Sequence, residues 1–262
     1  MKRIMIIVAA VVVFALSGCK EKDTKMKEII PDLKTTDPEF VELFDRFAFG
    51  DVVQITSDKL DDHTRYVCYI ATLLGCQGID EFREILPAAL DKSVAPVEVK
   101  EIVYQAVAYL GIGRVRPFLD ATNEILASRG IKLPLEPQGQ TTPETRREAG
   151  NQVQVDCFGE GMREFWNSAP EERRQINKWL AENCFGDYYT RTGLDLKTRE
   201  LITFCFLAAQ GGCEPQLKGH IAGNLNVGND KDFLLAVISS NIPFIGYPRT
   251  LNALSCLMEV AQ

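Results

Sequence analysis

Four short motifs occur twice in this chain, in the same order, and this internal repeat restricts the architecture more than any other feature of the sequence. The pairs are Phe49-Gly50-Asp51 with Phe185-Gly186-Asp187, Thr64-Arg65 with Thr198-Arg199, Gly75-Cys76 with Gly212-Cys213, and Tyr109-Leu110-Gly111 with Phe244-Ile245-Gly246. The members of each pair are about 135 residues apart, a nearly constant spacing that chance does not produce four times in order. The sequence therefore predicts two copies of one structural unit.

Apolar residues recur at helical spacing in both copies. The clearest sets are Val99, Ile102, Val103, Ala106 and Leu110 in the first copy and Ile202, Cys205, Phe206 and Ala209 in the second. Each set falls on one face of a helix, and no alternating run of comparable length indicates a strand. We therefore predict an all-α fold of two tandem helical units.

A segment rich in helix-breaking residues separates the copies. Residues 130–150 contain Pro134, Pro137, Gly139 and Pro143 together with several polar residues. Such composition is typical of a linker. The prediction is a first unit at residues 37–129, a linker at 130–150 and a second unit at 151–262.

The amino-terminal segment has the pattern of an export signal. Lys2 and Arg3 precede a short apolar run at residues 4–15, and Leu16-Ser17-Gly18-Cys19 follows it. This tetrapeptide resembles the lipobox of bacterial lipoproteins, in which the cysteine carries the lipid. We expect residues 1–18 to be a signal peptide, Cys19 to be lipidated and residues 19–36 to be a flexible tether, so that the protein is exported and anchored in the bacterial cell envelope. An ordinary signal peptide with an incidental cysteine is the alternative.

The charge distribution and the spacing of the histidines and cysteines argue against nucleic-acid binding and metal binding. The formal net charge is −7, and the sequence contains no cluster of basic residues that would bind a nucleic-acid backbone. The two histidines are far apart and the cysteines are scattered, so we expect no metal site and no cofactor. A small-molecule substrate remains the expected partner.

Seven cysteines follow Cys19, and none of them forms a CxxC pair. Because seven is odd, we expect at least one free thiol. Cys68, Cys205 and Cys256 fall within apolar helical patterns and are predicted to be buried as small hydrophobic residues.

The second copy carries an ordered set of motifs that resembles the carboxymuconolactone decarboxylase family, which includes the alkylhydroperoxidase D branch. The set is Phe185-Gly186-Asp187, Arg191-Thr192-Gly193-Leu194, Thr198-Arg199-Glu200-Leu201, Gly212-Cys213, His220, Asn226-Val227-Gly228 and Phe244-x-Gly246-x-Pro248. The resemblance covers most of residues 160–260 and, more weakly, residues 38–128. It implies compact helical units, often duplicated in one chain, and a homo-oligomer, with a trimer favoured.

The same resemblance implies a site in the second unit. In the peroxidase branch a Glu, a CxxC pair and a His form the site; Glu200, Cys213 and His220 match three of these positions, whereas Gln216 stands in place of the second cysteine. The decarboxylase branch keeps the His and has no redox cysteine pair. In the first unit Arg83 stands where a His would be, which implies a degenerate site.

Physical reasoning leaves both chemistries open. Pro215 suits a first helical turn, which would put Cys213 at a helix amino terminus that favours a reactive thiolate. His220 lies seven residues further on, too far along one helix for a direct hydrogen bond, so Glu200 or a water would have to connect them. Each residue also has a purely structural interpretation. Cys213 could be a buried cap residue, His220 a half-buried polar residue whose hydrogen bonds are satisfied, and Glu200 a carboxylate that stabilises the start of a helix.

Two arginines near the site have two interpretations as well. Arg191 and Arg199 are candidate ligands for a substrate carboxylate, although pairing with Glu or Asp is the commoner role for such residues. Because all the matched positions lie in the second unit, we expect a fragment of residues 150–262 to retain the ligand site.

The sequence therefore supports three functional hypotheses. The first is a one-thiol oxidoreductase that uses Cys213 with His220 and Glu200 and depends on an external thiol reductant. The second is an acid–base enzyme acting on a small carboxylated or lactone substrate. The third is an oligomeric binding module without catalytic activity.

Overall fold

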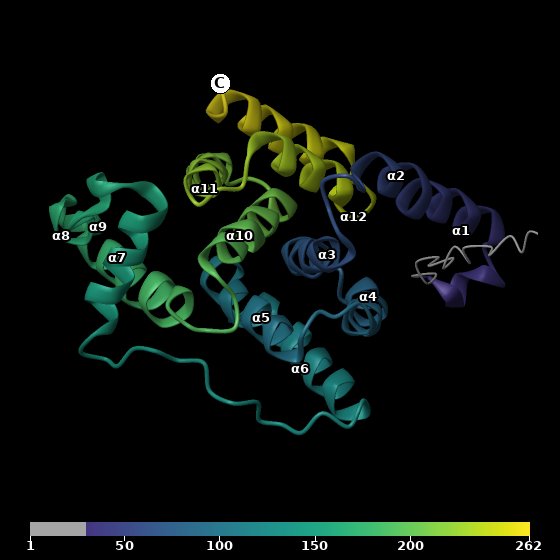
Figure 1. Ribbon diagram of the computed structural model, residues 1–262, viewed down its shortest axis with the longest axis horizontal. Coiled ribbons are helices and arrows are strands. Elements are labelled where there is room, and N and C mark those ends of the chain that lie inside the picture. The colour runs from purple at the N-terminus through teal and green to yellow at the C-terminus, as the bar shows by residue number, and fades with distance from the viewer. Residues whose placement is uncertain (1–29) are drawn as a thin grey trace, which may run out of the picture.

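The computed structural model describes residues 30–262, and this part of the chain is helical with no strand (Figure 1). The elements of the first unit are η1 (Pro31–Lys34), α1 (Pro38–Asp45), η2 (Arg46–Asp51), α2 (Val52–Thr56), α3 (Asp62–Cys76), α4 (Ile79–Asp91), α5 (Pro96–Leu110) and α6 (Ile112–Ser128). Those that follow are α7 (Arg146–Phe158), η3 (Glu160–Met162), α8 (Phe165–Ser168), α9 (Glu171–Trp179), η4 (Leu180–Tyr189), α10 (Leu196–Gln210), α11 (Glu214–Asn226) and α12 (Lys231–Val260). The predicted all-α fold is confirmed.

The repeated Thr-Arg motif lies in the first turn of a helix in both copies. Asp61 and Asp195 each cap a helix by accepting a hydrogen bond from the backbone N–H of Thr64 and Thr198, at 2.8 Å in both cases. A carboxylate at this position satisfies an otherwise unpaired N–H group, so both helices begin in the same way.

A glycine interrupts the helix in the second part of each copy. Gly111 separates α5 from α6 at φ +78°, and Gly246 breaks α12 at φ +71°. Glycine adopts this left-handed region without the Cβ clash that other residues suffer. α12 is therefore two helices joined at a kink, as α5 and α6 are.

The two units interlock through their central helices. α3 packs against α10 in the middle of the molecule (Figure 1), and a Cβ on Gly75 would come within 2.7 Å of Phe206 O. α5 of the first unit packs on α10, while α12 of the second packs on α3. Each central helix is thus buried by helices of both units.

All seven described cysteines are free. Cys68, Cys205 and Cys256 are buried, as predicted. Cys68 and Cys205 face each other between α3 and α10, and their mutual hydrogen bond raises the pKa of Cys68 well above its usual value. These thiols are part of the core.

The connection between the units is shorter than the predicted linker, because α7 begins at Arg146. The last residues of the predicted linker instead form the start of α7, which packs against η4. A Cβ on Gly150 would lie 2.0 Å from Ala181 O, and one on Gly186 would lie 2.2 Å from Arg146 O. Gly186 lies within η4 at this close helix–helix approach.

The predicted signal peptide, Cys19 and most of the tether lie outside the described residues. Within residues 30–262, no helix has both the length and the apolar character needed to cross a membrane.

Candidate functional site

A pocket of about 410 Å³ lies where α5, α7, η4, α10 and α11 meet. Its walls are mostly aromatic, aliphatic and sulfur-containing side chains, with three glutamines and one histidine among them. The lining residues are Ala108, Tyr109, Gln154, Phe158, Met162, Leu180, Cys184, Phe185, Leu207, Gln210, Cys213, Gln216 and His220. A largely apolar pocket with a few polar groups is the usual form of a small-molecule site.

Glu200 and His220 form a close pair at this pocket. Glu200 on α10 is completely buried, and its Oε2 atom lies 2.9 Å from His220 Nδ1 on α11. With Glu200 ionised, Nδ1 carries a proton and donates to the carboxylate, so Nε2 remains for a ligand. The structure thus brings together two of the three residues singled out as catalytic, by contact between neighbouring helices.

The imidazole ring is also held by aromatic side chains. Phe158 and Tyr109 each meet it edge-on, with ring centroids 5.4 and 5.5 Å away respectively. These contacts and the bond to Glu200 restrict the orientation of His220.

Tyrosine hydroxyls complete the shell around Glu200. Tyr189 donates to Glu200 Oε1 at 2.9 Å, and its hydroxyl lies 2.7 Å from Thr203 Oγ1 and 3.0 Å from Tyr109 Oη. Burial raises the pKa of both tyrosines well above the usual value, so they remain protonated and serve as donors. Gln105 extends the chain by donating to Thr203 Oγ1 at 2.9 Å.

A glycine in α11 leaves the space that the Glu200 carboxylate occupies. A Cβ on Gly223 would lie 2.4 Å from Glu200 Oε2 and 2.6 Å from Phe158. Asn224, the next residue, donates to the backbone carbonyls of Glu200 at 2.9 Å and His220 at 2.7 Å. Helix α11 therefore supplies the histidine and the space and bonds that place its partner.

Cys213 lines the pocket but has no hydrogen bond to either member of the Glu–His pair among the described contacts. It is the N-cap residue of α11, its thiol donates to Leu207 O at 3.5 Å, and Gln210 donates to its sulfur at 3.5 Å. Gln216, which replaces the second cysteine of the peroxidase pattern, lines the same pocket.

Two further cysteines lie near the site, and neither favours the thiolate form. Cys184 donates to Tyr109 Oη at 3.5 Å, and burial raises its pKa to about 12. Burial and the neighbouring Glu200 raise the pKa of Cys157 above its usual value. Both therefore stay protonated near neutral pH.

The candidate substrate-binding arginines lie elsewhere. Arg199 is buried, and both it and Arg191 bind the buried carboxylate of Glu101, at 3.0 and 2.9 Å. Neither lines the His220 pocket. The structure thus gives them the acid-pairing role rather than contact with a ligand at this pocket.

The first unit has no matching acid–histidine pair. Counted from the capping Asp61, Tyr66 occupies the position of Glu200. Arg83 is on the surface and pairs with Glu124 at 2.7 Å, while the residue equivalent to His220 by helix position is the buried Ile85. Within residues 30–262, no group of three or more His, Cys, Asp or Glu side chains could hold a metal ion.

The pocket is built jointly by both units, contrary to the expectation for a fragment of residues 150–262. Ala108 and Tyr109 come from the first unit and line it directly. Sequence reasoning identified Tyr109 only as a repeat marker and missed Tyr189 and Gln154. The one available signal was that position 109 is Tyr where its repeat partner, Phe244, has no hydroxyl.

Taken together, these features define an all-helical protein of two duplicated units with a buried Glu–His pair at an apolar pocket. The carboxymuconolactone decarboxylase family model matches residues 38–124 and 174–259, and the chain belongs to this family.

Two known proteins show the relationship in more detail. The chain is 28% identical over 102 residues to the 4-carboxymuconolactone decarboxylase of Acinetobacter baylyi (strain ATCC 33305 / BD413 / ADP1), a match that covers 39% of this chain and 75% of that protein. A crystal structure described as a gamma-carboxymuconolactone decarboxylase subunit, from Burkholderia xenovorans LB400, superposes with a TM-score of 0.51 at 21% identity and covers 90% of both chains. The second likeness is one of fold.

Proposed function

We propose that this protein is an acid–base enzyme of the decarboxylase type, acting on a small carboxylated or lactone substrate with His220 as the proton-transfer residue. The observation that supports this proposal best is the 2.9 Å contact between His220 Nδ1 and the buried Glu200 carboxylate, with the ring at the pocket wall. A carboxylate behind a histidine orients the ring and stabilises its protonated form.

The proposed chemistry needs one proton at a defined position. Loss of carbon dioxide from a substrate carboxylate leaves an electron pair on the substrate, which the lactone carbonyl can delocalise. Protonated His220 then delivers its Nε2 proton to carbon and recovers a proton from water. Glu200 accepts hydrogen bonds from both Tyr189 and His220, which hold its carboxylate behind the imidazole ring.

The pocket recognises a carboxylate with neutral donors, because none of its described lining residues is Lys or Arg. Gln154, Gln210 and Gln216 provide amides on the wall. Arg114 of the first unit donates from Nη1 to Gln210 Oε1 at 3.2 Å, which puts a guanidinium beside one of these amides. A carboxylated lactone ring can use both the amides and the apolar walls of this lining.

The test is turnover of 4-carboxymuconolactone by the full chain, followed as carbon dioxide release. His220→Ala is expected to lower kcat by about 10²- to 10⁴-fold, the usual contribution of a general acid or base. Cys213→Ser is the matched control from the same pocket and is expected to keep kcat within about threefold. If His220→Ala retains full activity, the proposal is wrong.

A second candidate function is a one-thiol oxidoreductase, favoured by the location of Cys213 in the same pocket as His220. Its thiolate would attack a peroxide oxygen, release water or an alcohol and become a sulfenic acid, which an external thiol would reduce. Peroxide consumption that requires external thiol and is lost in Cys213→Ser would support this function over the first. Ligand binding without turnover of either substrate would indicate a binding module.

We also propose export and lipid anchoring through Cys19. The support is the order of charged, apolar and small residues before that cysteine. The protein is expected to partition with membranes, and Cys19→Ser is expected to release it, because that substitution removes the acyl attachment site. A Cys19→Ser variant that remains membrane-bound would contradict the anchor.

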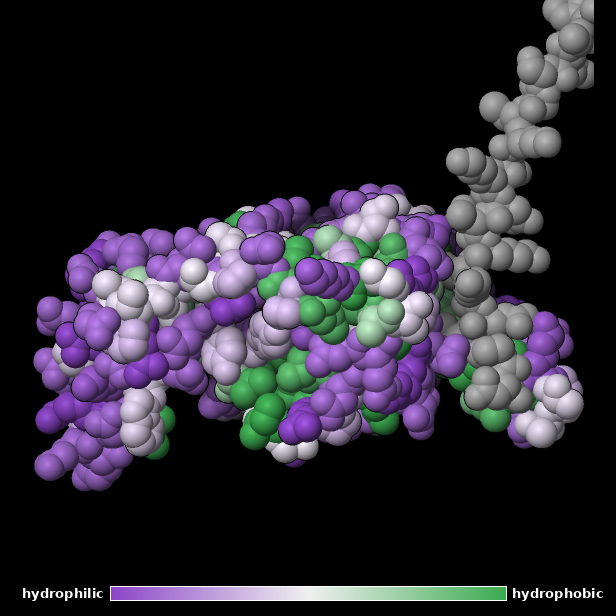
Figure 2. Space-filling model, turned by 90° about the horizontal axis from the view of Figure 1, so that it is seen from below, coloured by the Kyte–Doolittle hydropathy of each residue, from purple (hydrophilic) through white to green (hydrophobic). Residues whose placement is uncertain are grey.

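We propose further that the chain forms a homo-oligomer, with a trimer favoured by the family resemblance. Hydrophobic surface gathers on the central body in Figure 2, whereas the end formed by α7, α8 and α9 is mainly hydrophilic. Exposed apolar side chains on α1, α2 and α12 include Phe40, Leu43, Ile55, Tyr247 and Leu251. Light scattering after gel filtration tests the assembly, and a monomer at all concentrations would contradict it.

A further inference from the structure

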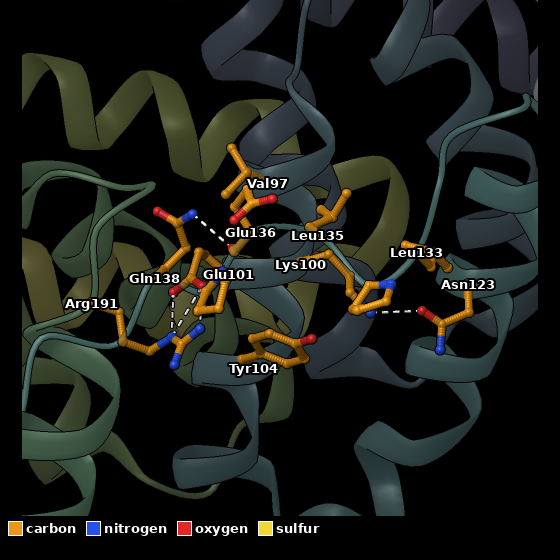
Figure 3. A pocket seen from close by; sticks show the side chains of 12 residues that line it. Val97, Lys100, Glu101, Tyr104, Asn123, Leu133, Leu135, Glu136, Gln138 and Arg191 are labelled. Carbon is orange, nitrogen blue, oxygen red and sulfur yellow. Dashed lines mark hydrogen bonds and ion pairs between the residues drawn. The ribbon is translucent and has the colours of Figure 1, made fainter. Parts of the chain in front are cut away.

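A second pocket, of about 460 Å³, lies between α5 and the segment that connects the two units (Figure 3). Its lining differs from that of the His220 pocket, with which it shares no residue. The lining residues are Val97, Lys100, Glu101, Tyr104, Asn123, Leu133, Pro134, Leu135, Glu136, Pro137, Gln138 and Arg191. Two cations and a row of apolar residues from the connecting segment therefore face one cavity.

Lys100 is the feature of this pocket that needs an explanation. Only 8% of the residue is exposed, its Nζ atom donates to Asn123 Oδ1 at 2.6 Å, and it lies 5.2 Å from the centroid of the Tyr104 ring. Among the described residues it has no ion pair with a carboxylate. A largely buried ammonium with two unused donors and no counter-ion is costly unless an anion occupies the adjacent space.

The neighbouring charges increase the local positive surplus. Arg191 lies 5.4 Å from the centroid of the same ring, and in Figure 3 it and Lys100 flank Tyr104. Arg191 binds Glu101 through Nε and Nη2, and Glu101 also binds Arg199. One buried carboxylate thus balances two guanidinium groups, which leaves a surplus of two positive charges when Lys100 is counted.

The opposing charge at this pocket is weak. Glu136 is exposed on the connecting segment, so water screens its carboxylate. Gln138 contributes an amide that donates to Glu136 O at 2.9 Å. The buried side of the cavity is therefore cationic, although the whole chain has a net charge of −7.

We propose that this pocket is a second ligand site, for a small organic carboxylate with an apolar body. The carboxylate accepts hydrogen bonds from Lys100 Nζ, and Arg191 adds its positive charge beside it. The apolar body packs against Val97, Leu133 and Leu135, which line the same cavity. Charge-assisted hydrogen bonds are the stronger ones, so Lys100 supplies affinity and the apolar wall supplies selectivity over inorganic anions.

The site does not depend on the function proposed for His220, because the two pockets share no lining residue. A hydrogen-bonded chain nevertheless connects them. Arg199, which shares Glu101 with Arg191, donates to Gln105 Oε1 at 2.8 Å, and Gln105 reaches Thr203 of the Glu200 shell. Because the linings are separate, a direct measurement of binding distinguishes a failure to bind at the Lys100 pocket from a failure to react at the His220 pocket.

The experiment is calorimetric titration of the full chain with benzoate, with benzamide as the uncharged probe of the same shape and inorganic phosphate as the probe without an apolar body. Benzoate is expected to bind, and the other two to bind at least tenfold more weakly. Lys100→Met, which keeps the apolar stem, is expected to raise the benzoate Kd at least tenfold. Lys218→Met, at a surface lysine that pairs with Glu259, is the matched control and is expected to leave the Kd unchanged.

Two further variants assign the binding to this pocket. Leu135→Trp is expected to abolish benzoate binding by filling the cavity from the connecting segment, even if Lys100→Met fails to fold. Because the His220 pocket is also proposed to take a carboxylated ring, the titration is repeated with His220→Ala, in which the benzoate binding that depends on Lys100 is expected to remain.

Several outcomes would overturn the proposal. One is that benzoate does not bind up to roughly 10 mM, a concentration well above a millimolar Kd. A second is that benzamide or phosphate binds as tightly as benzoate or more tightly. The others are unchanged benzoate binding in Leu135→Trp and loss of benzoate binding in His220→Ala.

Discussion

The position of the Glu200 carboxylate depends on the absence of a single side chain. Gly223 leaves the space into which Glu200 Oε2 extends, and a Cβ there would lie 2.4 Å from that oxygen. Real Cβ contacts are longer than this, so any other residue would displace either the carboxylate or helix α11. The glycine is therefore part of the support for His220, although it touches no ligand.

Gly223→Ala is expected to separate Glu200 from His220 and to weaken or break their hydrogen bond, because the added Cβ would occupy the space of Glu200 Oε2. The NMR signal of the His220 Nδ1 proton reports on that bond, and turnover is expected to fall when the bond is lost. Gly219→Ala in the same helix is the control, since a Cβ there meets nothing within 4 Å. That control is expected to be neutral or to stabilise the helix by up to about 1 kcal/mol. Equal behaviour of the two variants would show that Gly223 does not place Glu200.

At the scale of elements, α7 forms one wall of the pocket only because it approaches η4 closely. Gly150 and Gly186 allow backbone contact between the two, and α7 then presents Gln154 and Phe158 to the pocket. The first unit keeps the equivalent glycine, Gly50, but a Cβ there would meet nothing within 4 Å. The same motif therefore makes a helix contact in one unit and none in the other.

Gly186→Ala is expected to destabilise the protein by about 1–3 kcal/mol, in the range of overpacking substitutions, and to weaken ligand binding at the His220 pocket. Gly50→Ala, at the repeat-related position, is expected to change stability by less than about 0.5 kcal/mol. Thermal and urea unfolding of both variants compares them. A Gly50→Ala variant as destabilised as Gly186→Ala would contradict this explanation of the motif.

At the scale of the whole molecule, the two units depend on each other for a core and for the site. α10 packs against both α3 and α5, and Tyr109 of α5 reaches the Glu200 shell through Tyr189. Removing the first unit would expose the apolar surface of α10 and open one wall of the pocket. We therefore expect the duplicated chain to unfold as one cooperative structure.

A fragment of residues 146–262 is expected to aggregate or remain partly unfolded when produced alone, because the buried face of α10 loses its partner helices. Produced together with residues 30–145, it is expected to form a one-to-one complex that regains the pocket. Gel filtration and ligand binding measure both states. A soluble, folded fragment that binds ligand with the affinity of the full chain would show that the units are independent.

Much of the fold and part of the site could be predicted from sequence. The repeat and the helical periodicity are patterns of residue spacing, so the sequence alone reveals them. Glu200 and His220 could be selected through the family resemblance. The contribution of the Tyr109 and Tyr189 hydroxyls could not be predicted, because neither residue shares a helix with Glu200.

From the amino-acid sequence alone follow the helical fold, the two related units, and the acid and histidine retained in the second unit. The packing of the helices was needed to show that the arginines pair with Glu101 while Glu200 meets His220, and that the first unit supplies a wall of the pocket. The physical reason is the distance along the chain over which each kind of interaction acts. Caps and periodicity act within a few residues, whereas the close approaches at Gly75, Gly150 and Gly223 join helices that are distant along the chain, and backbone sterics at those points determine which side chains meet.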